Sequence, residues 1–220
     1  VEGVLLARYS YDSLRREPKG AALDRLTIVT EFDVAAAVER GRAMAAATSL
    51  ARDLANTPHS HLNATTLADI VAGLAPDRQL EVEIFDKDAL VALGCGGLLG
   101  VNQGSAEPPR MIKMIYRPPG EPSGRLTLVG KGLMYDSGGL ALKPGDEVHA
   151  QMKNDMSGAA AIVGAMVELA ALECPAQVTA YLMCTDNMPS ATAMALGDVI
   201  TIRGGTTVEV INTDAEGRLV

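Results

Sequence analysis

The most constraining feature of the sequence is an almost wholly apolar segment from Met156 to Leu172. A helix that is apolar on nearly every side is typical of a helix buried against a sheet. Strand-like segments precede it at 125–130 and follow it at 178–184. The segment therefore predicts a fold in which helices cover a β-sheet.

Helical and strand-like patterns alternate through the rest of the chain. The alanine-rich segment 33–54, with Asp33 as a plausible N-cap, predicts one long helix, which Pro58 stops because proline disfavours a helical residue before it. Asn63 or Thr65 is expected to cap a second helix that runs to Leu74. We also expect strands at 80–85, 111–116, 125–130, 178–184, 199–203 and 207–211, a short helix at 87–93 and a glycine-rich loop at 94–104. This order predicts an α/β fold, an α/β/α sandwich around a mixed, largely parallel sheet.

Composition excludes several classes of function. The net charge of −8 disfavours binding to nucleic acid or to an anionic membrane surface, and it fits cation binding. The most apolar stretch, 158–167, is cut off by Glu168 and is shorter than the about 20 residues that span a bilayer. Cys95, Cys174 and Cys184 lack CxxC spacing, so we interpret them as buried, reduced thiols.

Acidic and basic residues gather where predicted elements begin or end. Lys131 and Asp136 follow the strand at 125–130, Asp155 lies at the start of the apolar helix, and Asp214 and Glu216 follow the strand at 207–211. Ligands of open α/β sheets bind beyond the carboxyl ends of strands. Four carboxylates at one point would oppose folding unless cations were present. The pattern therefore predicts a site for two divalent metal ions.

Each of these features has a plainer interpretation when taken alone. The run from Asp214 to Gly217 is also a fair surface turn, and Asp155 could be an ordinary N-cap. Lys131 lies between glycines, but the phosphate-loop pattern GxxxxGK[ST] is absent. His59 and His61 could be a metal-binding pair or solvated loop residues. The combination of motifs gives the metal site its weight.

The motifs together closely resemble those of the leucyl aminopeptidase (cytosol aminopeptidase) family. They are Val129-Gly-Lys131-Gly with Asp136, Leu142-Lys143-Pro144, Met152-Lys-Asn-Asp155 and Asn212-Thr-Asp214-Ala-Glu216-Gly-Arg218. The resemblance covers most of the chain. It implies that 1–32 is the tail of an N-terminal domain, 33–54 an interdomain helix and 55–220 a metallopeptidase catalytic domain that is incomplete at its C-terminus. We therefore expect the chain to be a fragment.

The resemblance also implies roles for eight residues. Two divalent ions per subunit, Mn²⁺ or Zn²⁺, would be held by Lys131, Asp136, Asp155, Asp214 and Glu216, with Asp136 and Glu216 bridging them. Lys143 would polarise the scissile carbonyl, and Arg218 would hold a bicarbonate-like anion that acts as general base. Met152 would line the pocket for the first side chain of the substrate.

The function that these resemblances imply is a cytoplasmic leucyl aminopeptidase that releases leucine-like N-terminal residues from short peptides. The full-length protein would form a homohexamer, and no membrane or nucleic-acid partner is expected. One alternative is a catalytically silent relative with a structural or binding role. Another is a two-metal phosphoesterase, which the absence of histidines near the acids disfavours. The sequence departs from the usual family pattern at Asp186-Asn187, where Glu-Asn is common.

Overall fold

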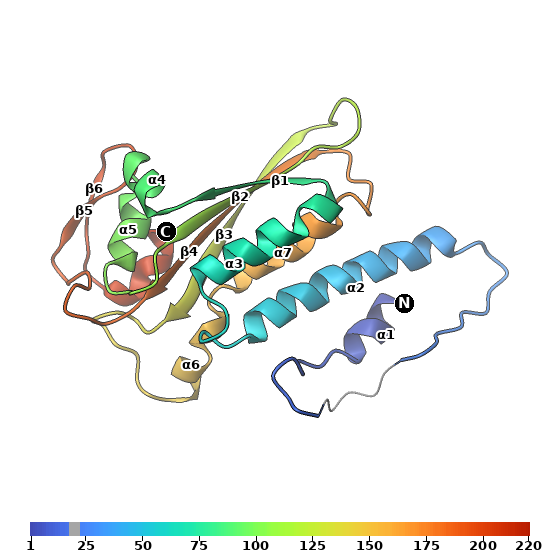
Figure 1. The fold of residues 1–220 in the computed structure, drawn as a ribbon, viewed down its shortest axis with the longest axis horizontal. Coiled ribbons are helices and arrows are strands. Elements are labelled where there is room, and N and C mark those ends of the chain that lie inside the picture. Colours follow the sequence, from blue (N-terminus) through green and yellow to red (C-terminus); the bar gives the residue numbers. More distant parts are fainter. Residues whose placement is uncertain (18–22) are drawn as a thin grey trace.

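The centre of the computed structural model, which describes residues 1–17 and 23–220, is a four-stranded sheet (Figure 1). Its strands are β1 (Leu80–Phe85), β2 (Arg110–Tyr116), β3 (Arg125–Asp136) and β4 (Gln177–Asn187), in the order β1-β2-β4-β3. The predicted α/β fold with a mixed sheet is confirmed. The sheet is less parallel than predicted, because only β3 and β4 pair in parallel. Phe85 pairs with Met111, so the chain leaves β1 and enters β2 at the same end of the sheet.

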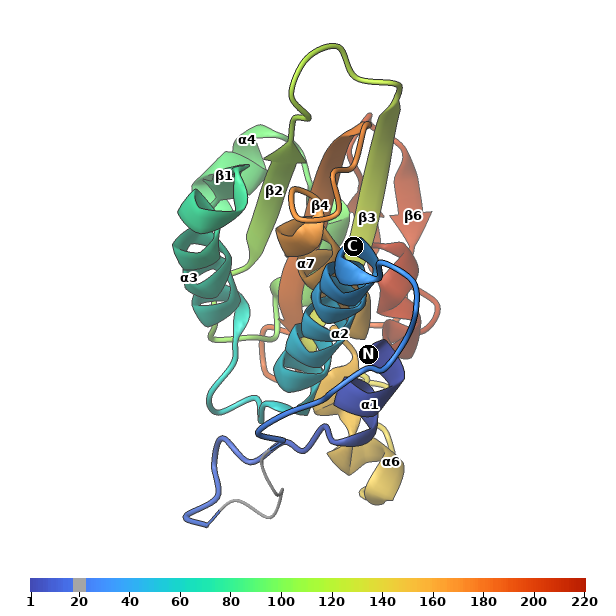
Figure 2. The ribbon, with the colours of Figure 1, turned by 90° about the vertical axis from the view of Figure 1, so that its right-hand side faces the viewer.

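Helices α3 (Ala64–Leu74) and α7 (Ser157–Glu168) cover one face of the sheet, and α2 (Ala35–Asn56) packs against α7 (Figure 2). The predicted apolar helix is thus confirmed, although it ends at Glu168. A Cβ on Gly130 would lie 2.9 Å from Ala159 Cα, so β3 and α7 approach each other closely. The main core lies between these helices and the sheet and includes Leu67, Val71, Ile112, Met114, Met156, Val163, Met166 and Leu182.

The other face carries α4 (Lys87–Ala92) and α5 (Gly96–Asn102). Leu90 of α4 and Leu98 of α5 form a smaller core with Met111 of β2. Helices therefore lie on both faces, as a sandwich requires. The prediction of a loop over 94–104 is wrong, because most of this segment forms α5. A Cβ on Gly96 or Gly97 would overlap a backbone carbonyl oxygen of a neighbouring segment. These glycines permit close packing rather than loop flexibility.

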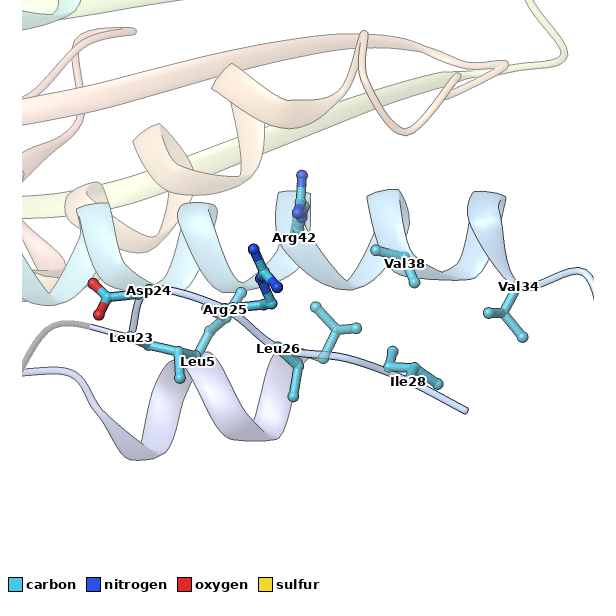
Figure 3. A pocket seen from close by; sticks show the side chains of 10 residues that line it. Leu5, Leu23, Asp24, Arg25, Leu26, Ile28, Val34, Val38 and Arg42 are labelled. Carbon is cyan, nitrogen blue, oxygen red and sulfur yellow. The ribbon is translucent and has the colours of Figure 1, made fainter. Parts of the chain in front are cut away.

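The N-terminal segments lie along the outside of α2. The helix α1 (Glu2–Ala7) packs against α2, whereas 26–32 has no regular secondary structure. Leu5, Leu26 and Val38 contribute to the wall of a cavity of about 470 Å³ between these segments (Figure 3). Of the predicted 1–32 tail, residues 18–22 lie outside the described residues. The division into domains stays a prediction.

Helix boundaries near the long helix follow the predicted signals with small shifts. The N-cap of α2 is Val34 rather than Asp33, whose Oδ1 accepts a hydrogen bond from the Ala35 amide at 3.1 Å. The helix ends two residues before Pro58. Asn63, rather than Thr65, caps α3 by accepting a hydrogen bond from the Thr66 amide at 2.8 Å.

Several short elements complete the fold. Strands β5 (Val199–Thr201) and β6 (Thr207–Glu209) form an antiparallel pair that is shorter than predicted. The short elements are η1 (Pro76–Arg78), α6 (Glu147–Ala150), η2 (Met152–Asn154), β5 (Val199–Thr201), β6 (Thr207–Glu209) and η3 (Thr213–Arg218). Within the described ranges, no helix is long and apolar enough to cross a membrane. Burial raises the pKa of Cys184 to about 12, whereas Cys95 and Cys174 are only half-buried.

Candidate metal centre

Three carboxylates meet beyond the end of β3. Oxygens of Asp136, Asp214 and Glu216 lie within 4.8 Å of one another. Asp136 is the last residue of β3, and its pairing partner on β4 is Asn187. Asp214 and Glu216 belong to η3, which begins after Asn212 accepts a hydrogen bond from the Asp214 amide at 2.9 Å. Asp136 and Glu216 are only 3% and 1% exposed, so two of the three negative charges are almost completely buried.

Lys131 joins this cluster to a fourth carboxylate. Its Nζ lies 2.8 Å from Asp155 Oδ2 and 2.8 Å from Glu216 Oε1. Burial lowers the pKa of Lys131, but the hydrogen bonds to the two carboxylates outweigh burial and leave this pKa raised. The pKa of Asp155 is also raised, because burial outweighs the opposing effect of Lys131. Asp155 does not cap the apolar helix, since the N-cap of α7 is Met156.

Lys143 approaches the same cluster from a loop. Its Nζ lies 2.8 Å from Asp136 Oδ2 and also contacts Asp214 Oδ1. Burial opposes the charge of Lys143, yet the hydrogen bonds to Asp136 and Asp214 raise its pKa above the ordinary value. Because its pKa is raised, Lys143 stays protonated beside the acids. The loop that carries it turns sharply through Gly138 and Gly139, whose φ angles of 89° and 64° favour glycine.

The donor set fits divalent cations. Four carboxylates face only two ammonium groups, so negative charge remains in excess. Glu216 Oε2 is buried and has no hydrogen-bond partner among the described residues. A buried charged oxygen without such a partner is costly unless a cation accompanies it. Oxygen ligands of this kind suit hard divalent ions.

The structure brings together six of the eight residues predicted from the sequence: Lys131, Asp136, Lys143, Asp155, Asp214 and Glu216. The prediction that Lys131 and Asp136 follow a strand ending at residue 130 is wrong. Both lie on β3, which continues through the buried residues Leu133 and Met134 with a shift in register before Tyr135. The strand therefore holds two of the site residues directly.

Arg218 and Met152 lie at the edges of the arrangement. Arg218 is exposed at the end of η3 and, with Arg203, lines a cavity of about 480 Å³. In the part of the chain that the structure describes, no ion pair joins Arg218 to the four carboxylates. Met152 is the half-buried first residue of η2, three positions before Asp155. The anion-binding and pocket-lining roles of these two residues stay predictions.

The histidines have other partners. His59 Nδ1 lies 3.7 Å from Asp186 Oδ1, whereas His61 Nδ1 contacts Ser60 Oγ at 2.9 Å. Burial raises the pKa of Asp186, although the charge of His59 and a hydrogen bond from Ser105 oppose this shift. The described contacts thus do not direct the two histidine rings toward a shared ion.

Sequence reasoning missed two polar residues behind the carboxylates. Asn187 is 3% exposed, and its Nδ2 donates to Asp136 Oδ1 at 2.8 Å and to the Thr213 carbonyl oxygen at 2.9 Å. The hydroxyl of Thr213 donates to the Gly138 carbonyl at 2.7 Å. The available signal was the polar run at 185–187, which directly follows an apolar strand.

Comparisons with known proteins support a family assignment. A model of the cytosol aminopeptidase family, catalytic domain, matches residues 49–220. A probable cytosol aminopeptidase of Leifsonia xyli subsp. xyli is 44% identical over 224 residues, and one of Mycobacterium bovis is 42% identical over 229 residues. Each alignment covers 100% of this chain but only 45% and 44% of the relative. The chain thus spans less than half the length of these curated relatives.

Solved structures extend the similarity to the fold. The bottromycin maturation enzyme BotP in complex with Mn has a TM-score of 0.91 and 42% identity, over 99% of this chain and 46% of that one. The leucyl aminopeptidase from Trypanosoma brucei in complex with bestatin has a TM-score of 0.78 and 37% identity, over 81% of this chain and 34% of that one.

Proposed function

The chain belongs to the cytosol aminopeptidase family, and from this premise we propose that it carries the two-cation site of an aminopeptidase. The whole protein would release leucine-like N-terminal residues from short peptides in the cytoplasm. One observation carries the proposal: four carboxylates converge on two lysines while the buried Glu216 Oε2 keeps no hydrogen-bond partner among the described residues. Divalent cations would neutralise that excess of charge.

The proposed ligands fall into two overlapping sets. Lys131, Asp136, Asp155 and Glu216 would hold one ion, and Asp136, Asp214 and Glu216 would hold the other. Divalent ions held there would lower the pKa of a bound water and polarise the carbonyl under attack. Four carboxylates without histidine or cysteine favour Mn²⁺ over Zn²⁺, because Zn²⁺ sites typically contain the softer nitrogen and sulfur ligands. The manganese complex named for BotP supports this choice.

Lys131 could be a ligand only as a neutral amine. In the cation-free chain, its two carboxylate partners keep the pKa of Lys131 raised. Cations bound by those same carboxylates would cancel their attraction for the proton, and the lysine would then release it. Lys131 would therefore change from an internal counterion to a nitrogen ligand.

Lys143 would keep its proton and act on the substrate. Its loop position lets the ammonium group leave Asp136 and Asp214 when cations neutralise them. It could then donate a hydrogen bond to the carbonyl oxygen of the scissile peptide and stabilise the negative charge that develops there. Asp136 and Asp214 thus hold Lys143 near the place where it is used.

Two further roles are part of the proposal. Met152, with its flexible apolar side chain, would form a wall of the pocket for a leucine-like residue. Arg218 would bind a bicarbonate-like anion that accepts a proton from the attacking water. For that role, Arg218 would have to turn from its present cavity toward the acids.

The test compares three substrates in the presence of Mn²⁺. We expect hydrolysis of leucine p-nitroanilide, no hydrolysis of its N-acetylated form and no hydrolysis of p-nitrophenyl phosphate. The acetylated substrate is the control, because an aminopeptidase requires a free amine. Cleavage of the phosphate ester alone would favour a phosphoesterase. Inactivity toward every substrate by the whole protein, with Mn²⁺ bound, would favour a silent relative.

A second candidate is a maturation role like that named for BotP. The observation that favours it is the similarity over 99% of this chain with a TM-score of 0.91, against 81% and 0.78 for the leucyl aminopeptidase. A panel of aminoacyl anilides, assayed beside a bottromycin precursor peptide, separates the candidates. Preference for leucine supports the first, whereas cleavage of none but a bottromycin precursor supports the second.

A further inference from the structure

Asn187 connects the two segments that carry the bridging carboxylates. It is the last residue of β4, and its side chain reaches both Asp136 Oδ1 and the Thr213 carbonyl oxygen, at 2.8 and 2.9 Å. A carboxamide has two N–H bonds, so these two acceptors use its complete donor capacity. Both acceptors are oxygens, which fixes the orientation of the amide. Asn187 thereby ties the end of β3 to the start of η3.

The backbone of Asn187 holds the residue that follows Asp136. The Asn187 carbonyl oxygen accepts hydrogen bonds from the Ser137 amide at 3.0 Å and from Ser137 Oγ at 2.7 Å. A Cβ on Gly139 would lie 2.7 Å from Asn187 Oδ1, so the turn leaves no space for another side chain there. Asn187 is therefore held firmly while it orients its neighbours.

The two oxygens of Asp136 have different surroundings as a result. Oδ1 accepts hydrogen bonds from Asn187 Nδ2 and, at 3.0 Å, from the Gly138 amide. Oδ2 instead faces the ammonium group of Lys143 at 2.8 Å. Neutral donors thus occupy one oxygen, and the other is directed toward the positive charge in the site.

We propose that Asn187 is the positioning residue of the metal centre. It commits Asp136 to bind cations through Oδ2, and by holding Thr213 it sets the distance from Asp136 to Asp214 and Glu216. This inference rests on the proposed two-cation function. A neutral amide suits the role, because a carboxylate at this position could not donate and would repel Asp136.

The chain offers a closely matched control in Asn102. This residue is 4% exposed, and its Nδ2 also donates two hydrogen bonds, to the Glu107 carbonyl oxygen at 2.8 Å and to Thr185 Oγ1 at 3.0 Å. Neither acceptor belongs to the proposed ligands. Asn102→Ala and Asn187→Ala therefore remove equally buried amides with equal numbers of donated bonds.

The experiment is a calorimetric titration of the 220-residue chain and both variants with Mn²⁺, at a temperature where circular dichroism shows that each is folded. We expect Asn187→Ala to weaken Mn²⁺ binding about 10- to 100-fold, the range typical of residues that orient metal ligands. Asn102→Ala should stay within about twofold of the parent chain, because neither acceptor of the Asn102 amide is a proposed metal ligand. If Asn187→Ala does not fold, Asn187→Ser is titrated in its place.

The outcomes separate this inference from the function on which it rests. A folded Asn187 variant that binds Mn²⁺ like the parent chain, or an equal loss in the Asn102 variant, overturns the positioning role and leaves the proposed function intact. A folded parent chain that binds no Mn²⁺ overturns both. Selective weakening in the Asn187 variant supports both.

Discussion

Gly130 and Lys131 follow one another on β3, but the regions that they enter are built in opposite ways. Gly130 lies against Ala159 of α7, in a core where apolar side chains fill the space. Lys131 enters a cluster of charges in which Glu216 Oε2, a buried oxygen, has no hydrogen-bond partner among the described residues. The comparison teaches that contacts between apolar side chains are enough to stabilise the core, whereas the site requires additional positive charge.

The largest expected effect comes from neutralising the most buried acid of the site. Glu216→Gln keeps the shape of the side chain but removes a charge shared by both proposed cation sites. We expect Mn²⁺ binding to weaken by more than about 100-fold, because even residues behind metal ligands cost up to that amount. Titration calorimetry measures it.

Glu168→Gln is the matched control for Glu216→Gln. Glu168 is also buried, and it pairs with Arg78 at 2.9 Å, at the opposite end of α7 from Asp155. This control should lower thermal stability and leave Mn²⁺ binding unchanged. Equal affinities of the two variants for Mn²⁺ would erase the distinction between core and site.

Next in size is the loss of Lys143. Lys143→Ala should leave Mn²⁺ bound and slow the turnover of leucine p-nitroanilide by about 100-fold, because one preorganised donor to the developing oxyanion is removed. Steady-state kinetics and calorimetry measure the two properties separately. Lys87→Ala, an exposed change on α4, is the control. Loss of the metal from the Lys143 variant contradicts the assigned role.

A substitution on the core side of β3 should lower the stability of the fold and leave Mn²⁺ binding unchanged. Gly130→Ala forces a Cβ against the α7 backbone and should reduce the free energy of unfolding by about 1–3 kcal/mol. Gly73→Ala is the control, since space around this helical position is open, and it should stabilise the chain by about 0.5–1 kcal/mol. Urea unfolding gives both values. Folded Gly130→Ala that fails to bind Mn²⁺ would show that core and site are not separable.

The smallest effect expected within the site is that of Asp155→Asn. It removes one negative charge from the proposed ligand set to which Lys131 also belongs. We therefore expect about tenfold weaker binding of one Mn²⁺ ion, with the other ion retained. Asp69→Asn, an exposed change on α3, is the control for general electrostatics. Unchanged binding of both ions would remove Asp155 from the ligand set.

The same contrast explains what the sequence could predict. The apolar run at 156–172 identified α7, because a buried helix is apolar along its own sequence. The acids identified the site because they lie where predicted elements begin or end. The glycines of α5 were misinterpreted as a loop, since the carbonyl groups that they contact come from distant segments. The hydrogen bond between Asn187 and Asp136 joins residues 51 positions apart, and the polar run at 185–187 does not reveal which partner Asn187 has. The assigned roles came from resemblance to a family.

Native mass spectrometry in Mn²⁺ tests the central claim most directly, because one spectrum reports the number of ions on each folded chain. For the 220-residue chain, we predict two Mn²⁺ ions, and for Glu216→Gln fewer than two at the same concentration. A folded parent chain without Mn²⁺, or a Glu216→Gln variant with the same two ions, would contradict the proposal that these carboxylates form a two-cation site.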